Sequence, residues 1–155
     1  MGVIHRAAVL DDDEIAHASA LGLDILPTDR PLFSLPCPRL EGTMCGVYRD
    51  RPRVCGRYKC QMLQNVEAGK TPMSEAIEKV SEAKRLLGEL HSILPNGMSC
   101  QQARRLAQGA PSDGSVDVRL RATALDLFID KFFRNSRDRK SFELSSVEFE
   151  QEPRG

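Results

Sequence analysis

Four of the five cysteines fall within one 24-residue stretch, at Cys37, Cys45, Cys55 and Cys60. Their spacing is C-x7-C-x9-C-x4-C, whereas Cys100 stands 40 residues beyond the last of them. Thiolates are the ligands that zinc and iron–sulfur clusters select, and four of them suit either centre. The sequence therefore predicts one metal site made by these four cysteines, with Cys100 as a bystander.

Two other roles for the clustered cysteines stay open beside metal binding, namely disulfide bonds and reduced, buried thiols. Disulfides need an oxidising compartment. The first residues lead directly into the acidic run Asp11–Glu14 without an apolar h-region, so we expect no signal peptide and a cytoplasmic protein. This expectation favours metal over disulfides, and it leaves inert buried thiols as an alternative.

Cations crowd the cysteine stretch, against only Glu41 and Asp50 of opposite charge. A four-thiolate site on a divalent ion carries a net charge of about −2, which nearby cations stabilise. An ordinary solvated basic loop is the alternative interpretation. The cations of this stretch are Arg39, Arg49, Arg51, Arg53, Arg57 and Lys59.

Arg51 and Pro52 have a more specific prediction within this stretch. Pro52 fits the start of a helix that carries Cys55, because its fixed φ suits that position. We expect Arg51 to hold the loop through hydrogen bonds to carbonyls or to a carboxylate such as Asp50 or Glu41.

Composition argues against several other functions. Lys plus Arg and Asp plus Glu both number 22, so no net charge attracts nucleic acid or an anionic membrane. Tyr48 and Tyr58 are too few for a base-stacking platform, and no apolar run approaches a membrane span. The sequence contains no H-E-x-x-H, C-x-x-C, phosphate loop or nucleophile elbow, so we assign no catalytic residue and no reaction. A protein partner of unknown identity is left open.

The chain is predicted to form a single α+β domain over residues 1–155. Residues 1–60 form a small, irregular, cysteine-rich lobe, packed on a helical hairpin or three-helix bundle within residues 61–138. A short strand and a tail are expected over residues 139–155.

In the first half, residues 3–10 are expected to form a strand. Asp11 is predicted to cap a helix over residues 12–21, with Glu14 as its capping-box partner and Gly22 as the helix stop.

Further along, short extended segments are expected over residues 23–26 and 45–48. The helix that begins at Pro52 must bend or end before Cys60, because cysteines five residues apart do not share a helix face.

The second half has clearer helical periodicity. A long amphipathic helix is predicted over residues 73–94, a shorter one over 100–108 with Ser99 as its cap, and a third over 118–133, after a linker at 110–115. We expect their apolar stripes to form the core. The stripe positions are Met73, Ile77, Val80, Ala83, Leu87, Leu90 and Leu94, then Val118, Ala122, Leu125, Ile129, Phe132 and Phe133, widened by Leu120, Leu127 and Phe128.

The cysteine stretch also resembles a known family. Pro36-Cys37-Pro38-x-Leu40, followed by Cys45-x-Val47-Tyr48-x-x-Arg51-Pro52-x-x-Cys55-x-x-Tyr58-x-Cys60, is similar to the YkgJ-type cysteine-cluster family, described as a zinc- or iron-chelating domain. The resemblance covers about residues 1–70. It implies zinc or iron–sulfur binding by the four cysteines, and no settled reaction.

One departure from that family bears on the metal. Its members usually carry an upstream C-x-x-C-x-x-C-C cluster, and this chain has no cysteine before Cys37. Either that part of the site is lost or the true start lies upstream; four cysteines alone favour a single zinc or a weakened site. The alternatives are an iron–sulfur accessory or redox enzyme component and a metal-free helical interaction module with relic cysteines.

Overall fold

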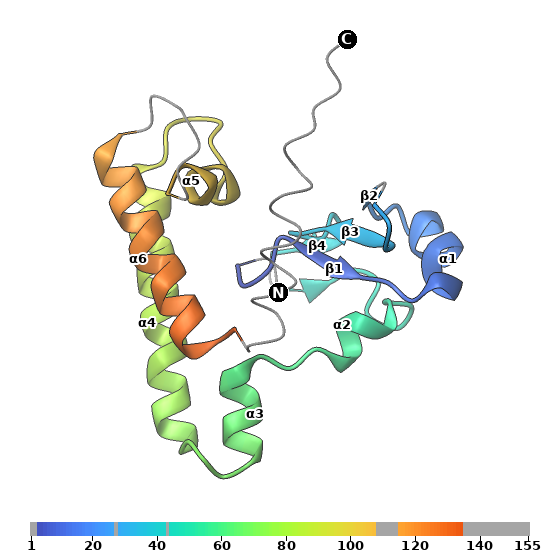
Figure 1. Ribbon diagram of the computed structural model, residues 1–155, viewed down its shortest axis with the longest axis horizontal. Coiled ribbons are helices and arrows are strands. Elements are labelled where there is room, and N and C mark those ends of the chain that lie inside the picture. Colours follow the sequence, from blue (N-terminus) through green and yellow to red (C-terminus); the bar gives the residue numbers. More distant parts are fainter. Residues whose placement is uncertain (1–2, 27, 43, 108–114, 135–155) are drawn as a thin grey trace. The chain divides into compact units, whose positions relative to one another are not determined.

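The computed structural model describes residues 3–26, 28–42, 44–107 and 115–134. The chain is an α+β protein that forms two compact units, Met1–Lys59 and Cys60–Gly155 (Figure 1). The boundary falls between Lys59 and Cys60, one residue before the predicted change from a cysteine-rich to a helical part. The expected strand and tail of residues 139–155 lie outside the described residues, and a single domain stays a prediction.

The first unit is built around a three-stranded antiparallel sheet. Its strands are β1 (Ala7–Val9), β2 (Ile25–Leu26) and β3 (Leu32–Ser34), in the order β1-β3-β2. Phe33 on the middle strand pairs with Ala8 on one side and with Ile25 on the other. Both predicted strands of this region are confirmed as shorter segments, and β3 was not predicted.

A hydrophobic core fills one side of this sheet, so the lobe is less irregular than expected. Phe33 is fully buried at its centre, and it carries the largest apolar side chain of the group. Burying apolar side chains of this size is the main favourable term in folding. The buried residues of this core are Ala8, Leu10, Ala18, Leu23, Phe33 and Leu35.

A short helical segment connects β1 to β2. It consists of η1 (Asp12–Glu14), a 3₁₀ turn, and α1 (Ile15–Ala20), and it ends before Gly22, whose φ of 71° is the left-handed conformation expected at a helix stop. The predicted capping box is wrong, because the Asp11 side chain makes no cap hydrogen bond. Arg53 and Arg57 bind the Asp11 carboxylate instead, and the backbone N–H of Arg53 binds Glu14, as described below.

The second unit is helical. It contains α3 (Gln61–Glu67), α4 (Met73–Ile93), α5 (Cys100–Ala107) and α6 (Val116–Phe132). Helices α4 and α5 both pack against α6, and Figure 1 shows α4 and α6 side by side. None of the helices in the described part of the chain is both long and apolar enough to cross a membrane.

Helices α5 and α6 both begin at a serine cap. Ser99 Oγ accepts a hydrogen bond from the backbone N–H of Gln102, and Gln102 Oε1 accepts one from Ser99 N, at 3.1 and 2.7 Å. This reciprocal pair is a capping box, so the predicted cap is confirmed. Ser115 caps α6 by accepting from Asp117 N.

The apolar stripes are only partly buried. Val118, Ala122, Leu125, Ile129 and Phe133 are buried as predicted, and so is Leu90. Other stripe positions are wrong as core residues, because a helix that packs on one side leaves its remaining apolar positions in solvent. The exposed ones are Met73, Ile77, Val80, Leu120 and Leu127.

A buried ion pair joins α5 to α6 and was not predicted. Arg104 is 1% exposed, and its Nε donates to Asp126 Oδ1 at 2.6 Å. Arg134 pairs with Asp130 and lies 3.7 Å from Asp126. Buried charges are tolerated when they are paired in this way.

Two leucines of α6 test the division between core and surface. Leu125 is fully buried and Leu127 is 66% exposed. We expect Leu125→Ala to lower the free energy of unfolding by about 2–5 kcal/mol, since it leaves a cavity. Leu127→Ala should change it by no more than about 0.5 kcal/mol. Urea denaturation followed by circular dichroism measures both; equal losses would contradict the assignment of Leu127 to the surface.

Candidate metal centre

The structure places three of the four clustered cysteines in the first unit and the fourth at the start of the second. Cys37 follows β3, Cys45 lies at the end of a β-hairpin, and Cys55 lies on α2 (Arg53–Arg57). Cys60 is the residue before α3. All are half-buried free thiols, as is Cys100.

A two-stranded hairpin positions Cys37 and Cys45. Its strands are β4 (Leu40–Glu41) and β5 (Met44–Cys45), and Cys45 is the register partner of Leu40. Cys37 O accepts from Leu40 N at 3.1 Å, which closes a turn before β4. Both cysteines are therefore neighbours of Leu40. The expected extended segment 45–48 is wrong beyond Cys45, because the chain turns there.

Arg39 fastens this hairpin to the end of α1. Its Nε donates to Leu21 O, and a Cβ on Gly22 would lie 2.9 Å from the Arg39 guanidinium. Gly22 therefore provides the space for this arginine as well as the helix stop.

Helix α2 positions Cys55. Pro52 precedes it with φ −52° and is fully buried, and Cys55 N donates to Pro52 O at 2.9 Å. The predicted start at Pro52 and the end before Cys60 are both confirmed. Cys37 and Cys55 pack against the same hydrophobic core of the first unit.

The pKa of Cys55 responds to its burial and to nearby charges. Burial raises the pKa of Cys55, and charge on Cys37 and Cys45 raises it further, while the Arg51 guanidinium acts in the opposite direction. The Glu14 carboxylate adds to the rise.

The donor chemistry of these thiols fits a soft or borderline cation, because thiolates with a nearby cation are what such ions require. Their spacing is wider than a bound ion needs. No three His, Cys, Asp or Glu side chains of the described residues are grouped closely enough to hold a metal. The structure therefore does not bring any three of the four predicted cysteine ligands together. Binding by Cys60 stays a prediction.

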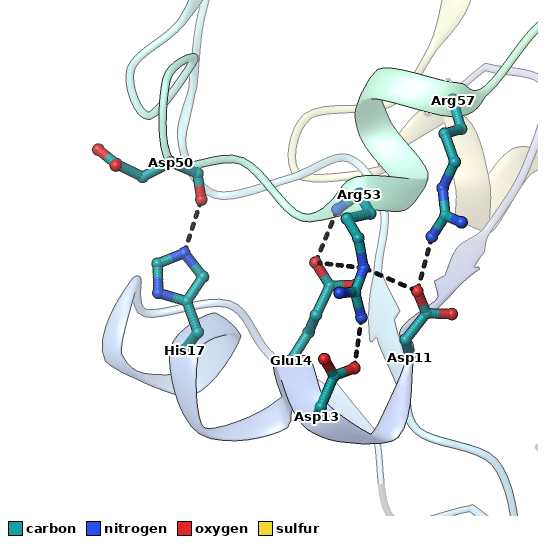
Figure 2. Close-up of polar contacts among 7 residues, drawn as sticks. All are labelled: Asp11, Asp13, Glu14, His17, Asp50, Arg53 and Arg57. Atoms are coloured by element: carbon teal, nitrogen blue, oxygen red, sulfur yellow. Dashed lines mark hydrogen bonds and ion pairs between the residues drawn. The ribbon is translucent and has the colours of Figure 1, made fainter.

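An acidic clamp, formed by Asp11, Asp13 and Glu14, holds α2 against η1 (Figure 2). Arg53 Nε donates to Asp11 Oδ2 at 2.9 Å, its other end pairs with Asp13, and its backbone N–H donates to Glu14 Oε1 at 2.8 Å. Arg57 also donates to Asp11, at 2.6 Å.

The clamp alters the acidity of its members. Hydrogen bonds from Arg57 and Arg53 lower the pKa of Asp11, and one from Arg53 lowers that of Asp13. The same contacts raise the pKa of Arg53. From the sequence, Arg53 and Arg57 were expected among the cations around the cysteines. The acidic run Asp11–Glu14 was the signal that could have identified their partners.

Two further contacts hold the segment around α2. His17 Nε2 donates to Asp50 O at 2.7 Å, as Figure 2 shows. His5 and Tyr58 share a 2.9 Å hydrogen bond between Nε2 and the phenol oxygen, with their rings edge to face. Neither histidine was assigned a role from the sequence.

Arg51 has a different contact from the one expected. Its guanidinium carbon lies 3.8 Å from the centre of the Tyr48 ring, which is a cation–π contact. Arg51 thus holds the turn between β5 and α2 by stacking, while its charge acts on Cys55.

Comparison with family models, with curated proteins and with solved structures finds no match for this chain. The resemblance of residues 36–60 to the YkgJ-type family therefore stays a prediction from the motif.

The acidic clamp can be tested by removing its central arginine. Arg53→Ala removes the ion pairs with Asp11 and Asp13 and keeps the backbone hydrogen bond to Glu14, so α2 should be held less firmly and its amides should exchange with deuterium several-fold faster in hydrogen-exchange mass spectrometry. Arg49→Ala, at an exposed arginine of the preceding turn, is the matched control. If the two variants exchanged alike over residues 53–57, the clamp would have no role in holding α2.

Proposed function

We propose that this protein binds a metal ion through its clustered cysteines. Cys37, Cys45 and Cys55 supply the core of the donor set, and Cys60 is the fourth thiol predicted from the sequence. One observation supports the proposal: Cys37 and Cys55 pack against the same hydrophobic core, and Cys45 pairs with Leu40, whose N–H donates to Cys37 O. Nearby cations offset the charge that thiolates bring to such a site.

We propose zinc as the ion and a structural role for it. Cys45 and Cys55 lie on the hairpin and on α2, whose strands and helix have only two and five residues. A bound zinc ion would join these elements, and the free energy of binding would become free energy of folding. Reduced thiols of this kind suit a cytoplasmic protein.

A cysteine-to-serine series tests this function. We expect Cys37→Ser, Cys45→Ser and Cys55→Ser each to weaken zinc binding by at least about tenfold, since each removes a donor. Cys60→Ser tests the predicted fourth thiol, and Cys100→Ser is the control that should bind as the unchanged protein does. Competition with a chromophoric chelator measures affinity, and elemental analysis measures stoichiometry. Wild-type affinity in all three first-unit variants would refute the proposal.

An iron–sulfur cluster is the alternative centre for the same thiols. It would make the protein an accessory or redox component, and purification without oxygen would then give a brown protein that absorbs near about 400 nm. A colourless protein with one zinc per chain supports zinc instead.

The second candidate function is a metal-free helical interaction module. The exposed apolar side chains of α4 and α6 favour it, because they form surface that a protein partner could cover. Under this alternative, a variant without the four clustered thiols would keep its fold, and the unchanged protein would purify without metal.

Arg51 provides a second test of the metal centre. Its charge favours the thiolate form of Cys55, so Arg51→Ala should lower zinc affinity severalfold, measured by the same chelator competition. Arg49→Ala removes the same charge from the same turn and should have a smaller effect. Equal affinities would leave Arg51 with only its contact to Tyr48.

A further inference from the structure

Helix α6 carries apolar side chains on two opposite faces. Leu125 and Ile129 are buried on the face that packs within the second unit, against α4 and α5. Val116, Leu120 and Leu127 lie on the other face and are 79%, 66% and 66% exposed. A helix that is hydrophobic all round is a buried helix, so the second face of α6 has the composition of a surface that a partner covers.

The apolar residues of this second face form one continuous stripe. They recur at steps of four, four and three residues, which keeps them on the same side of the helix. The stripe has an acidic residue beside its first member, Asp117, and a basic residue one turn beyond its last member, Lys131, and both are exposed. The α6 stripe consists of Val116, Leu120, Ala124 and Leu127.

The pattern of the α6 stripe is complementary to itself when it is reversed. Asp117 lies seven residues before Ala124, and Lys131 lies seven residues after it. Leu120 lies four residues before Ala124, and Leu127 lies three residues after it. A second α6 that crossed at Ala124 in antiparallel orientation would pack Leu120 against Leu127 of the partner subunit and bring Asp117 to Lys131 of the partner subunit. A two-fold axis would make each contact twice.

The residues at the centre and at the ends of the stripe suit this arrangement. Ala124 is small, and small side chains at the crossing point let two helices approach closely. The Asp117 carboxylate has no ion pair within the described residues, and its backbone N–H is bound by Ser115. Lys131 Nζ lies 5.1 Å from the centre of the Phe132 ring. In a parallel pair the two charges would stay about 21 Å apart along the axis, because the rise is about 1.5 Å per residue.

We propose that α6 is a self-association surface, on which a second copy of this chain packs its own α6 in antiparallel orientation. The inference is independent of the proposed metal centre. Two helices of 17 residues make a smaller contact than a standard interface of about 1,600 Å², so we expect a dissociation constant of about 10–100 μM or weaker. In dilute solution the protein is then a monomer, and truncating Leu127 has little effect on its folding.

Sedimentation of the full chain, from about 5 to about 500 μM, tests this inference. We expect the unchanged protein to dimerise with rising concentration. Leu127→Glu should raise the dissociation constant at least about tenfold, since it brings a charge into an apolar contact. Ile77→Glu is the matched control, because Ile77 is an apolar residue of α4 that is 58% exposed, and it should dimerise as the unchanged protein does. Circular dichroism should show that both variants keep their helices.

The two end charges test the antiparallel orientation. Asp117→Lys and Lys131→Glu should each weaken the dimer, and the double variant should recover most of the loss, because it exchanges the two signs. A carbodiimide joins a carboxylate to an amine only where the two groups touch. Asp117 and Lys131 of one helix lie about 21 Å apart, so an amide between them, identified by mass spectrometry, would have to join two copies.

Four results would overturn the inference. The first is a monomer at every concentration. The second is such a monomer in which Leu127→Glu lowers the free energy of unfolding and Ile77→Glu does not, which would assign the α6 stripe to another part of the same chain. The third is a dimer that Ile77→Glu disrupts and Leu127→Glu does not. The fourth is a dimer without the Asp117–Lys131 crosslink and without recovery in the double variant, which would exclude the antiparallel pair.

Discussion

The attachment of α2 to the segment Asp11–Glu14 determines where Cys55 lies. Helix α2 has five residues and contains Gly56, so it is far below the length at which a helix is stable alone, about 12–15 residues. Its first N–H is satisfied by Glu14, 39 residues earlier in the chain, and its arginines reach Asp11 and Asp13. The contacts of the cysteine-bearing turn depend on this one junction.

The exposed and buried parts of the clamp contribute differently. Ion pairs of Arg53 with Asp11 and Asp13 lie in solvent, where single pairs add little, although several charges on one guanidinium restrict its geometry. The Glu14 contact is buried and replaces the side-chain cap that Pro52 cannot supply. We infer that the exposed pairs fix the orientation of α2 and that Glu14 fixes its position.

Local rules predicted the parts of this chain in which the deciding residues are close in sequence. The start at Pro52, the stop at Gly22 and the capping box of Ser99 and Gln102 each depend on chemistry within a few residues, and all are confirmed. The same rules failed at Asp11, because a local cap competes with arginines more than 40 residues away. Sequence proximity alone cannot decide that competition.

Periodicity has a similar limit in the second unit. Leu120, Leu125 and Leu127 all fit an apolar face of α6, yet only Leu125 is buried. The 3.6-residue period identifies a face, whereas the neighbours α4 and α5 decide how wide the covered part is. Arg104 shows the converse, since a charged residue is fully buried where Asp126 can pair with it.

The same reasoning applies to the candidate metal centre. The short spacing of the four cysteines in the sequence predicted that they form one group. Spacing measures only the separation along the chain. The folded first unit places Cys37 and Cys55 against one hydrophobic core, and Glu14, 23 residues before the first cysteine, binds the start of the helix that carries Cys55. A metal ion bound by Cys55 would stabilise this junction as well, because it would hold α2 in place.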